Sequence, residues 1–409
     1  MVKKGYKQTE VGVIPEKWKD KKLGDVGKVC MCKRIFANQA SNTGEVPFFK
    51  IGTFGKEADA YISKGLYEDY KQRFSYPQKG DVLISAAGTL GRTIVFEGKD
   101  AYFQDSNIVW LATDKELLCN EYLYHYYKVI KWGASEGSTI ARLYNGIICN
   151  THIALPDVEE QKQIATVLSE IDELISLTEK QISKKKAIKQ GAMQELLTGK
   201  RRLPGFSGEW ETRTLHEISN EMVDGPFGSN LKTEHYTTER QVRIIQLSNI
   251  GEAGWNNANV KYTTFSHAAE LQRCIVQPGS ILIAKMMPAG RAIICPDNEK
   301  SYILGSDVVK VVPNSSVDSR YLVYATKSRF YLDQIADDTQ GSTRARTSVS
   351  KLRKTAILFP EKDEQIAIAD ILSEMDMEIA TLEEKLAKYR QVKQGMMQQL
   401  LTGKICLEK

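Results

Sequence analysis

Hydrophobic residues recur at alternating steps of three and four along two long segments of this chain, residues 159–200 and 362–409. Residues at such steps share one face of an α-helix, which is the spacing of a coiled-coil seam. The seam positions are Ile164, Leu168, Ile171, Ile175, Thr178, Ile182, Lys185, Lys189, Ala192 and Leu196 in the first segment, and Ile368, Leu372, Met375, Ile379, Leu382, Leu386, Tyr389, Lys393, Met396 and Leu400 in the second. The pattern predicts two helices, each about 60 Å long, packed side by side and antiparallel.

The two helical segments are copies of one sequence. EEQKQIATVLSEIDELISLTEKQISKKKAIKQGAMQELLTGK (159–200) aligns without a gap with DEQIAIADILSEMDMEIATLEEKLAKYRQVKQGMMQQLLTGK (363–404). Upstream, GSTIAR matches GSTRAR, and GDVLISAAGTLGR (80–92) matches GSILIAKMMPAGR (279–291) more weakly. An internal repeat fixes the architecture, so we expect a pseudo-two-fold chain in which a variable domain precedes each helix.

The variable regions, 1–158 and 201–361, carry short apolar runs typical of strands. VPFFKIGTF, DVLISA, RTIVFEG and SNIVWLAT have the counterparts VRIIQLSNI, SILIAK, RAIICP and SDVVKVV, all rich in β-branched or aromatic residues. EYLYHYYKVIKWGA and SRYLVYATKSRFYLDQIA each predict a helix before a Gly-Ser-Thr loop. The predicted fold class is therefore mixed α/β (α+β), with two globular domains separated by the two long helices.

The ends of the predicted helices carry glycine and basic residues. Thr-Gly-Lys follows the last apolar residue of each copy, and glycine there is typical of a helix stop. The first helix also contains Lys184, Lys185, Lys186 and Lys189. This run is either a solvated helix face or a contact for a partner or a phosphate group.

Composition narrows the class of protein without deciding it. The 409 residues are 42% hydrophobic and 26% charged, with a formal charge of +5 that permits a polyanionic partner without requiring one. No apolar run reaches the roughly 18 residues of a membrane span, and the first residues lack the apolar centre of a signal peptide, so a cytoplasmic protein is expected. Seven scattered cysteines predict buried thiols and no metal site.

Sequences that carry known catalytic chemistry are missing. The chain has no GxxxxGK[ST] phosphate loop, HExxH, GxGxxG or Pro-Pro pair. Asp157, Glu160 and Lys162 are similar to the acidic and lysine residues of a metal-dependent nuclease, but Pro, Asp and Glu are ordinary residues at a helix start. We therefore expect no catalytic residue and no cofactor bound by this chain.

Basic and small polar residues gather in loops at matching places of both variable domains. This is the composition that contacts phosphates and base edges in double-stranded DNA. Each loop alone is more typical of a solvated surface, and their recurrence favours DNA. The candidate DNA contacts are Ser85, Thr89, Arg92, Arg142, Asn230, Lys232, Lys285, Arg291, Arg344, Arg346, Lys351, Arg353 and Lys354.

In combination, these features resemble the specificity subunit of type I restriction-modification systems. The resemblance rests on the helix starts Leu155-Pro156 to Gln161 and Phe359-Pro360 to Gln365, on the repeated LSEID/LSEMD and KQGxMQxLLTGK segments, and on VGVIPEKW and LPGFSGEW. It covers essentially the whole chain.

The resemblance implies a division of labour. Target recognition domains (1–158 and 201–361) would each read one half of a bipartite asymmetric DNA site. Helices (159–200 and 362–409) would set the spacing and dock two modification subunits, which are adenine methyltransferases. S-adenosylmethionine, ATP and Mg would belong to the modification and restriction subunits. The implied partner-binding residues are Glu170, Asp172, Glu374 and Asp376.

Other interpretations stay open at this point. The chain could be a non-catalytic coiled-coil adaptor, a free-standing enzyme, or the recognition half of another modification system. An adaptor predicts no salt-dependent DNA binding, and an enzyme predicts cofactor binding by the purified chain.

Overall fold

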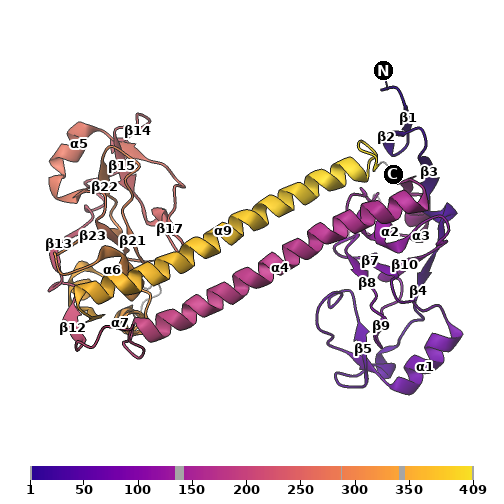
Figure 1. Ribbon diagram of the computed structural model, residues 1–409, viewed down its shortest axis with the longest axis horizontal. Helices are drawn as coiled ribbons and strands as arrows, with labels where there is room; N and C mark the ends of the chain where they lie inside the picture. Colours follow the sequence, from indigo (N-terminus) through magenta and orange to yellow (C-terminus); the bar gives the residue numbers. More distant parts are fainter. Residues whose placement is uncertain (1, 134–141, 287, 340–345, 408–409) are drawn as a thin grey trace. The chain divides into compact units, whose positions relative to one another are not determined.

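The computed structural model describes residues 2–133, 142–286, 288–339 and 346–407. The chain divides into two compact units (Figure 1). Unit 1 comprises Met1–Glu179 and Glu384–Lys409, and unit 2 comprises Lys180–Glu383. Each unit therefore combines one variable domain with parts of both long helices.

Unit 1 is built from short strands with few helices. Its strands are β1 (Tyr6–Thr9), β2 (Gly12–Pro15), β3 (Lys19–Lys22), β4 (Gly27–Met31), β5 (Val46–Phe49), β6 (Tyr61–Ile62), β7 (Val82–Ser85), β8 (Thr93–Val95), β9 (Tyr102–Phe103), β10 (Ile108–Thr113) and β11 (His152–Leu155). Its domain helices are α1 (Lys64–Arg73), α2 (Asn120–Tyr126) and α3 (Asn145–Asn150), with short 3-10 turns at Leu23–Asp25 and Ala37–Gln39.

Unit 2 contains a similar set of elements. Its strands are β12 (Glu211–Thr214), β13 (Ser219–Asp224), β14 (Tyr236–Thr237), β15 (Val242–Ile245), β16 (Ile250–Gly251), β17 (Gly254–Trp255), β18 (Tyr262–Thr263), β19 (Ile275–Val276), β20 (Ile281–Ala284), β21 (Ala292–Ile294), β22 (Tyr302–Leu304), β23 (Val308–Pro313) and β24 (Ala356–Phe359). Its domain helices are α5 (Phe265–Glu270), α6 (Ser319–Ala325), α7 (Arg329–Thr339) and α8 (Val349–Lys354).

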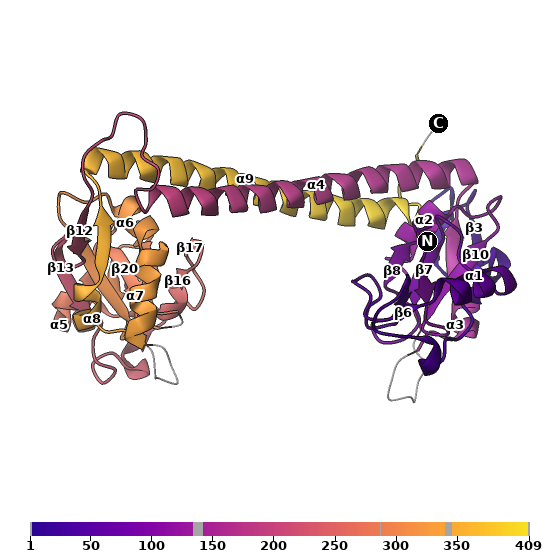
Figure 2. The same cartoon turned by 90° about the horizontal axis from the view of Figure 1, so that it is seen from below.

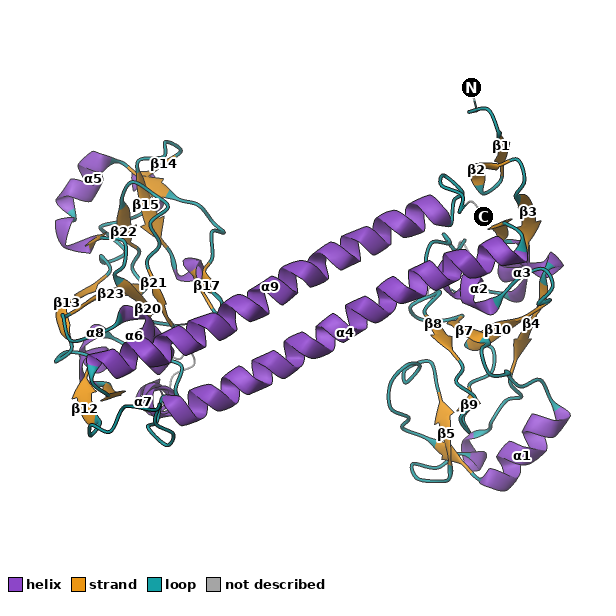
Figure 3. Ribbon diagram, viewed as in Figure 1, coloured by secondary structure: helices purple, strands orange, loops and turns teal. Residues whose placement is uncertain are grey.

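The strands of the two units pair in the same order. Unit 1 has a four-stranded antiparallel sheet, β4-β10-β7-β8, and unit 2 has β13-β23-β20-β21 (Figure 3). A second sheet contains one parallel pair in each unit, β5 with β9 and β15 with β22. The strand that leads to the long helix pairs with an early strand, β11 with β3 and β24 with β12. The prediction of a mixed helix and strand fold is confirmed.

The four-stranded sheet is buried on both faces, because side chains alternate along each strand. In unit 2, Ile281 and Ile283 of β20 pack against α6, α7 and α8, on the face that these helices cover (Figure 2). Leu282 and Ala284 point to the second sheet, with β15 and β22. Unit 1 has the same division, with Val82 and Ile84 on one face of β7 and Leu83 on the other. The continuous apolar runs of the sequence reflect this two-sided burial.

Two 39-residue helices, α4 (Val158–Leu196) and α9 (Lys362–Leu400), contribute to both units. Every residue of the predicted seam is buried or half-buried. Ile164 and Leu168 of α4 join Leu400 of α9 in the core of unit 1, and Leu196 joins Ile368 and Leu372 in the core of unit 2. The helix ends are thus part of the domain cores as well as of the seam.

Ion pairs give the direction of the two helices in each unit. In unit 1, Lys393 pairs with Asp172 and Arg390 with Glu179. In unit 2, Lys185 pairs with Glu378, Lys186 with Glu383 and Lys189 with Asp376. Within each unit α4 and α9 run antiparallel, as Figure 1 shows. Most of the lysine run of α4 therefore faces acidic residues of α9.

In each unit, a tryptophan forms a hydrogen bond to a glutamate near the start of a long helix. Trp18 of unit 1 donates its indole N–H to Glu160 at 3.1 Å, and Trp210 of unit 2 donates to Glu364 at 3.0 Å. Gly403, with φ +67°, leaves no room for a Cβ beside Pro15 and Trp18, and Gly199, with φ +68°, packs on Trp210. This contact explains why KW or EW recurs in the sequence together with TGK.

Two predicted helices differ in the structure. The helix expected over EYLYHYYKVIKWGA is confined to α2, Asn120–Tyr126. The helix expected over SRYLVYATKSRFYLDQIA is broken into α6 and α7. The break falls at Thr326, whose hydroxyl bonds to the carbonyl of Val323, and side-chain bonds of this kind compete with helix continuation.

Candidate nucleic-acid interface

An arginine ends the loop after β7 in unit 1 and the loop after β20 in unit 2. Each arginine donates a hydrogen bond to a backbone carbonyl of another segment of the same unit. Arg92 donates from Nη2 to the carbonyl of Ile51 at 3.1 Å and lies over the ring of Phe54. Arg291 donates to the carbonyl of Ile250 at 3.2 Å. Both arginines are half-buried. They give the loop a fixed position and leave part of each guanidinium at the surface.

A second arginine joins the same loop to a turn before β10 or β23. Arg142 forms a β-bridge with Ala87 and donates to Asn107 at 2.7 Å. Arg346 forms the matching bridge with Met286 and pairs with Asp307 at 2.8 Å. The Arg346 side chain is 51% exposed. We call the loop, the turn and the two arginines of each unit the arginine cluster.

Only some of the predicted DNA contacts near the arginine clusters are exposed. Thr89 is exposed within the loop, beside Arg92. Ser85 is fully buried, and its hydroxyl accepts from the amide of Arg92 and donates to the carbonyl of Thr89. Lys285 is 5% exposed and pairs with Asp224. The prediction of Ser85 and Lys285 as exposed DNA contacts is wrong, because both side chains hold their own loops together.

The remaining basic candidates lie on or near α8. Arg353 is exposed and donates to the carbonyl of Met222, Lys354 is exposed, and Lys351 is half-buried. Arg344 lies outside the described residues.

Asn230 and Lys232 are both exposed in the loop after β13, where Lys232 pairs with Glu234 at 3.5 Å.

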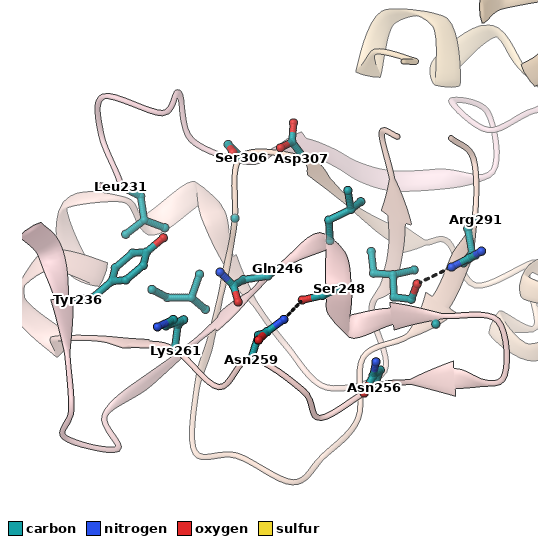
Figure 4. Close-up of a pocket in the computed structure, with 15 residues that line it drawn as sticks. Leu231, Tyr236, Gln246, Ser248, Asn256, Asn259, Lys261, Arg291, Ser306 and Asp307 are labelled. Carbon is teal, nitrogen blue, oxygen red and sulfur yellow. Dashed lines mark hydrogen bonds between the residues drawn. The ribbon is translucent and has the colours of Figure 1, made fainter. Parts of the chain in front are cut away.

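Unit 2 has a polar hollow beside its arginine cluster, with a volume of about 590 Å³. Figure 4 shows Gln246, Lys261, Asn259 and Ser248 projecting into the same region, with Ser306 and Asp307 on the opposite wall. The side-chain oxygen of Gln246 is buried without a hydrogen-bond partner. These side chains offer donors and acceptors beside Arg291, and sequence composition did not single them out because they are dispersed over several loops.

The candidate partner-binding carboxylates fall into two groups. Glu170 and Glu374 are exposed on α4 and α9. Asp172 instead contacts Lys128 at 3.3 Å and Lys393, while Asp376 contacts Lys189 and accepts from Tyr324 at 2.7 Å. Asp172 and Asp376 thus join α4 to α9 and to the adjoining domain, and their part in partner binding stays a prediction.

Burial and charge set the ionisation of the Asp172 cluster. Burial alone would raise the pKa of Asp172, but the hydrogen bond from Lys393 and the charges of Lys128 and Lys393 lower it below its usual value. Burial lowers the pKa of His125 to about 4, with a smaller contribution from Lys128. His125 is therefore neutral near pH 7, and its 4.0 Å approach to Asp172 is not an ion pair at that pH.

The residues that are similar to a nuclease site have other partners. Glu160 is buried, accepts from Trp18 and pairs with Lys17, while Asp157 caps the amide of Glu160. Gln161 bonds to the carbonyls of Leu117 and Pro156. These residues lie at the junction between β11 and α4. Among the residues that the structure describes, no three His, Cys, Asp or Glu side chains are grouped as metal ligands.

Comparisons with known proteins identify the family. The sequence profile described as "Type I restriction modification DNA specificity domain" matches residues 15–186 and 208–390. A putative type I restriction enzyme specificity subunit of Haemophilus influenzae is 56% identical over 158 residues, which are 38% of this chain and 41% of that relative. The putative MjaX specificity subunit of Methanocaldococcus jannaschii is 25% identical, over 98% of this chain and 96% of the relative.

A solved structure has the same fold. The S subunit of a type I restriction-modification system from M. genitalium superimposes with a TM-score of 0.61 at 15% identity, covering 94% of this chain and 96% of the other. The two profile matches and the shared strand order of the two four-stranded sheets define the class of a two-domain DNA specificity protein. The chain belongs to the type I restriction modification DNA specificity family. In the described part of the chain, no helix has the length and apolar character of a membrane span.

Proposed function

We propose that this chain is the DNA-recognition subunit of a type I restriction-modification complex, and that each variable domain reads one half of a bipartite, asymmetric target. The observation that carries the proposal is the recurrence of the arginine cluster, with Arg142 on Asn107 in unit 1 and Arg346 on Asp307 in unit 2. The same scaffold bears different side chains in the two units, so the two half-sites differ in sequence.

The arginine clusters fit DNA by charge and by shape. A half-exposed guanidinium can fork onto guanine or a phosphate, and a partner that fixes its plane reduces the entropy lost on binding. In unit 2 the polar hollow adds amide, hydroxyl and ammonium groups next to Arg291. Phosphate contacts of this kind make affinity fall as the salt concentration rises.

The long helices serve as a spacer and as a docking surface in this proposal. Their seam forms a coiled coil with pseudo-two-fold symmetry, supported by buried seam residues in both units. Glu170 and Glu374 are exposed, and so are the apolar side chains Leu174, Leu177 and Met377. Exposed apolar residues on a helix are typical of a protein-binding surface, and two methyltransferase subunits are the proposed occupants.

Catalysis belongs to the partners in this proposal. The modification subunits bind S-adenosylmethionine and methylate adenine, and the restriction subunits use ATP and Mg. This chain contributes double-stranded DNA recognition in the cytoplasm. The alternatives are a non-catalytic coiled-coil adaptor and the recognition half of another modification system, which do not require two methyltransferase subunits.

Single-molecule methylation mapping of the source genome, with and without the gene, tests the proposal. We expect methyladenine to disappear from one gapped, asymmetric, two-part motif when the gene is deleted. A complementing copy with Lys162→Met, which changes an exposed side chain of the rejected nuclease set, is a control and should restore the same motif. An unchanged map in an organism whose methyltransferase subunit is expressed would contradict the proposal.

A further inference from the structure

An exposed phenylalanine stands at the matching place of each unit. Phe36 follows β4 and is 56% exposed, and Phe227 follows β13 and is 83% exposed. Strand β4 pairs with β10 as β13 pairs with β23, so the two loops leave corresponding strands. A phenyl ring in water forfeits the stabilisation that burial provides, and its recurrence in corresponding loops of both units singles out these two residues as candidates for a ligand contact.

The two rings are presented by the same type of turn. The amide of Gln39 donates to the carbonyl of Phe36 at 2.9 Å, and the amide of Asn230 donates to the carbonyl of Phe227 at 2.8 Å. Phenylalanine is therefore the first residue of a closed turn with an amide side chain at its fourth position. Gln39 also accepts from the amide of Phe36 at 2.9 Å. The turns fix the backbone at Phe36 and Phe227, from which the exposed rings project.

Both loops are fixed to the arginine cluster of their unit. In unit 1, Arg34 pairs with Asp105 at 2.9 Å, two residues from Asn107, which holds Arg142. In unit 2, the amide of Gly225 donates to the carbonyl of Val308 at 3.0 Å. A Cβ on Gly225 would overlap the carbonyl of Gly305, so the loop lies directly on the turn that carries Asp307.

The sequence around each ring favours DNA over a protein surface. Residues 33–39 read KRIFANQ and residues 225–232 read GPFGSNLK, so both loops contain basic and amide residues and no acid. Basic residues interleaved with an exposed aromatic ring are typical of nucleic-acid contacts, where the ring stacks on a base or enters between base steps.

We propose that Phe36 and Phe227 each stack on a base of the target, one in each half-site. This inference rests on the proposed function, since the two half-sites must exist for the rings to be divided between them. It adds a positioning role, in which the ring anchors the loop in a groove while the arginine cluster contacts the adjoining backbone and base edges.

The first experiment measures binding of the complete complex, with its methyltransferase subunits, to a fluorescent duplex that carries the mapped target. Stacking on an aromatic side chain is worth about a tenfold to hundredfold change in affinity per base. We expect Phe36→Ala and Phe227→Ala each to weaken binding in that range, and Phe→Trp variants to retain it. Phe330→Ala removes an exposed ring from α7 of unit 2 and should bind as the wild type does.

An abasic scan assigns each ring to its half-site. Removing one base should weaken wild-type binding about tenfold at the stacked position, whereas Phe227→Ala should lose nothing further there. For Phe36→Ala, base removal should cause no further loss of binding at one position, and that position should lie in the other half-site from the one assigned to Phe227. If both alanine variants bind the intact duplex as Phe330→Ala does, the inference is wrong.

Two measurements separate the possible causes of a loss. Thermal unfolding of each variant chain must match the wild type, and sedimentation without DNA must show the same assembly with the methyltransferase subunits. Weaker assembly with unchanged DNA binding would assign the rings to a protein contact and overturn the inference. A wild-type complex without preference for the mapped target would overturn the proposed function itself.

Discussion

At the scale of single residues, the arginine clusters of the two units differ in the partner of their second arginine. Arg346 neutralises the carboxylate of Asp307, whereas Arg142 bonds to the uncharged amide of Asn107. The same substitution in the two units should therefore have different consequences. Removal of Arg346 leaves a negative charge on a surface proposed to face phosphate groups, while removal of Arg142 does not.

This difference gives a prediction for DNA binding by the complete complex. Arg346→Ala should weaken binding about tenfold or more and reduce the slope of log affinity against log salt by about 1. Arg142→Ala should weaken binding less, and Arg346→Ala combined with Asp307→Asn should recover part of the loss. Titrations at several salt concentrations measure all three values. Equal losses for the two arginines, without recovery in the double variant, would argue against a charge effect.

His125 provides a residue-scale prediction for pH. Its pKa is about 4 in the folded chain against 6.5 as the ordinary value, so the unfolded chain binds more protons between these limits. Stability is therefore fully present above pH 6.5 and falls as the pH decreases toward 4, by roughly 3 kcal/mol in total. The depressed pKa of Asp172 removes further stability below about pH 4, in the same direction.

Chemical unfolding of the wild type and of His125→Gln at several pH values checks this expectation. The variant can still reach Ser169, which His125 contacts at 3.0 Å, but it cannot gain a proton. We expect its unfolding free energy to change less between pH 6.5 and pH 4. A variant with the full wild-type pH dependence would show that other groups are responsible.

At the scale of elements, α4 and α9 are joined by charges placed inside an apolar seam. Lys393 is the polar interruption of the second seam, and it meets Asp172 where that carboxylate also contacts Lys128. In unit 2 the matching pair is Lys189 with Asp376. Asp172 is 29% exposed and Asp376 is 46% exposed, so water replaces a lost partner less well at Asp172.

Replacing each lysine by methionine tests this arrangement. Lys393→Met should destabilise the chain by about 1–3 kcal/mol, because it removes a partner from a partly buried carboxylate. Lys189→Met should cost less, and Asp172→Asn should restore part of the stability lost in Lys393→Met. Denaturant unfolding at constant pH gives the three free energies. A stabilising effect of Lys393→Met alone would mean that apolar packing outweighs the ion pair.

At the scale of the whole molecule, each unit contains sequence from both halves of the repeat. The C-terminal residues Leu400 and Leu401 lie in the core of unit 1, and Leu196 and Leu197 lie in that of unit 2. The variable domains are thus held on repeated helix ends that differ little between the units. This organisation allows a domain to change while the helix contacts are preserved.

Exchange of a variable domain is the corresponding prediction. Replacing residues 1–155 with the matching region of another family member, with Trp18 and its contacts to Glu160 retained, should change one half of the methylated motif. The other half and the gap length should stay the same, because unit 2 and both long helices are unaltered. Methylation mapping of the exchanged strain reads all three features. A change in both halves would contradict independent recognition by the two units.

Local periodicity was sufficient for much of the fold. The three-four spacing predicted both long helices, and the TGK glycines predicted their ends; both glycines have positive φ. Apolar runs located three of the four strands in each four-stranded sheet and missed β4 and β13. These features depend on residues close in sequence, where side-chain direction and backbone conformation are set by neighbours. The combination of repeated segments was specific enough to indicate the family.

The candidate site was predicted less completely, because exposure depends on residues far apart in sequence. Lys285 and Ser85 lie in basic or polar segments, yet tertiary contacts bury them. Asp172 forms an ion pair with Lys393, which is far from it in sequence. Conversely, Phe227 lies in the same loop as the predicted contacts Asn230 and Lys232, but the prediction did not include this phenylalanine, which is 83% exposed. The sequence by itself determined the helices, the repeat and the family. Only the tertiary structure decided which charges are already paired and which side chains stay exposed, because burial and pairing depend on residues far apart in the chain.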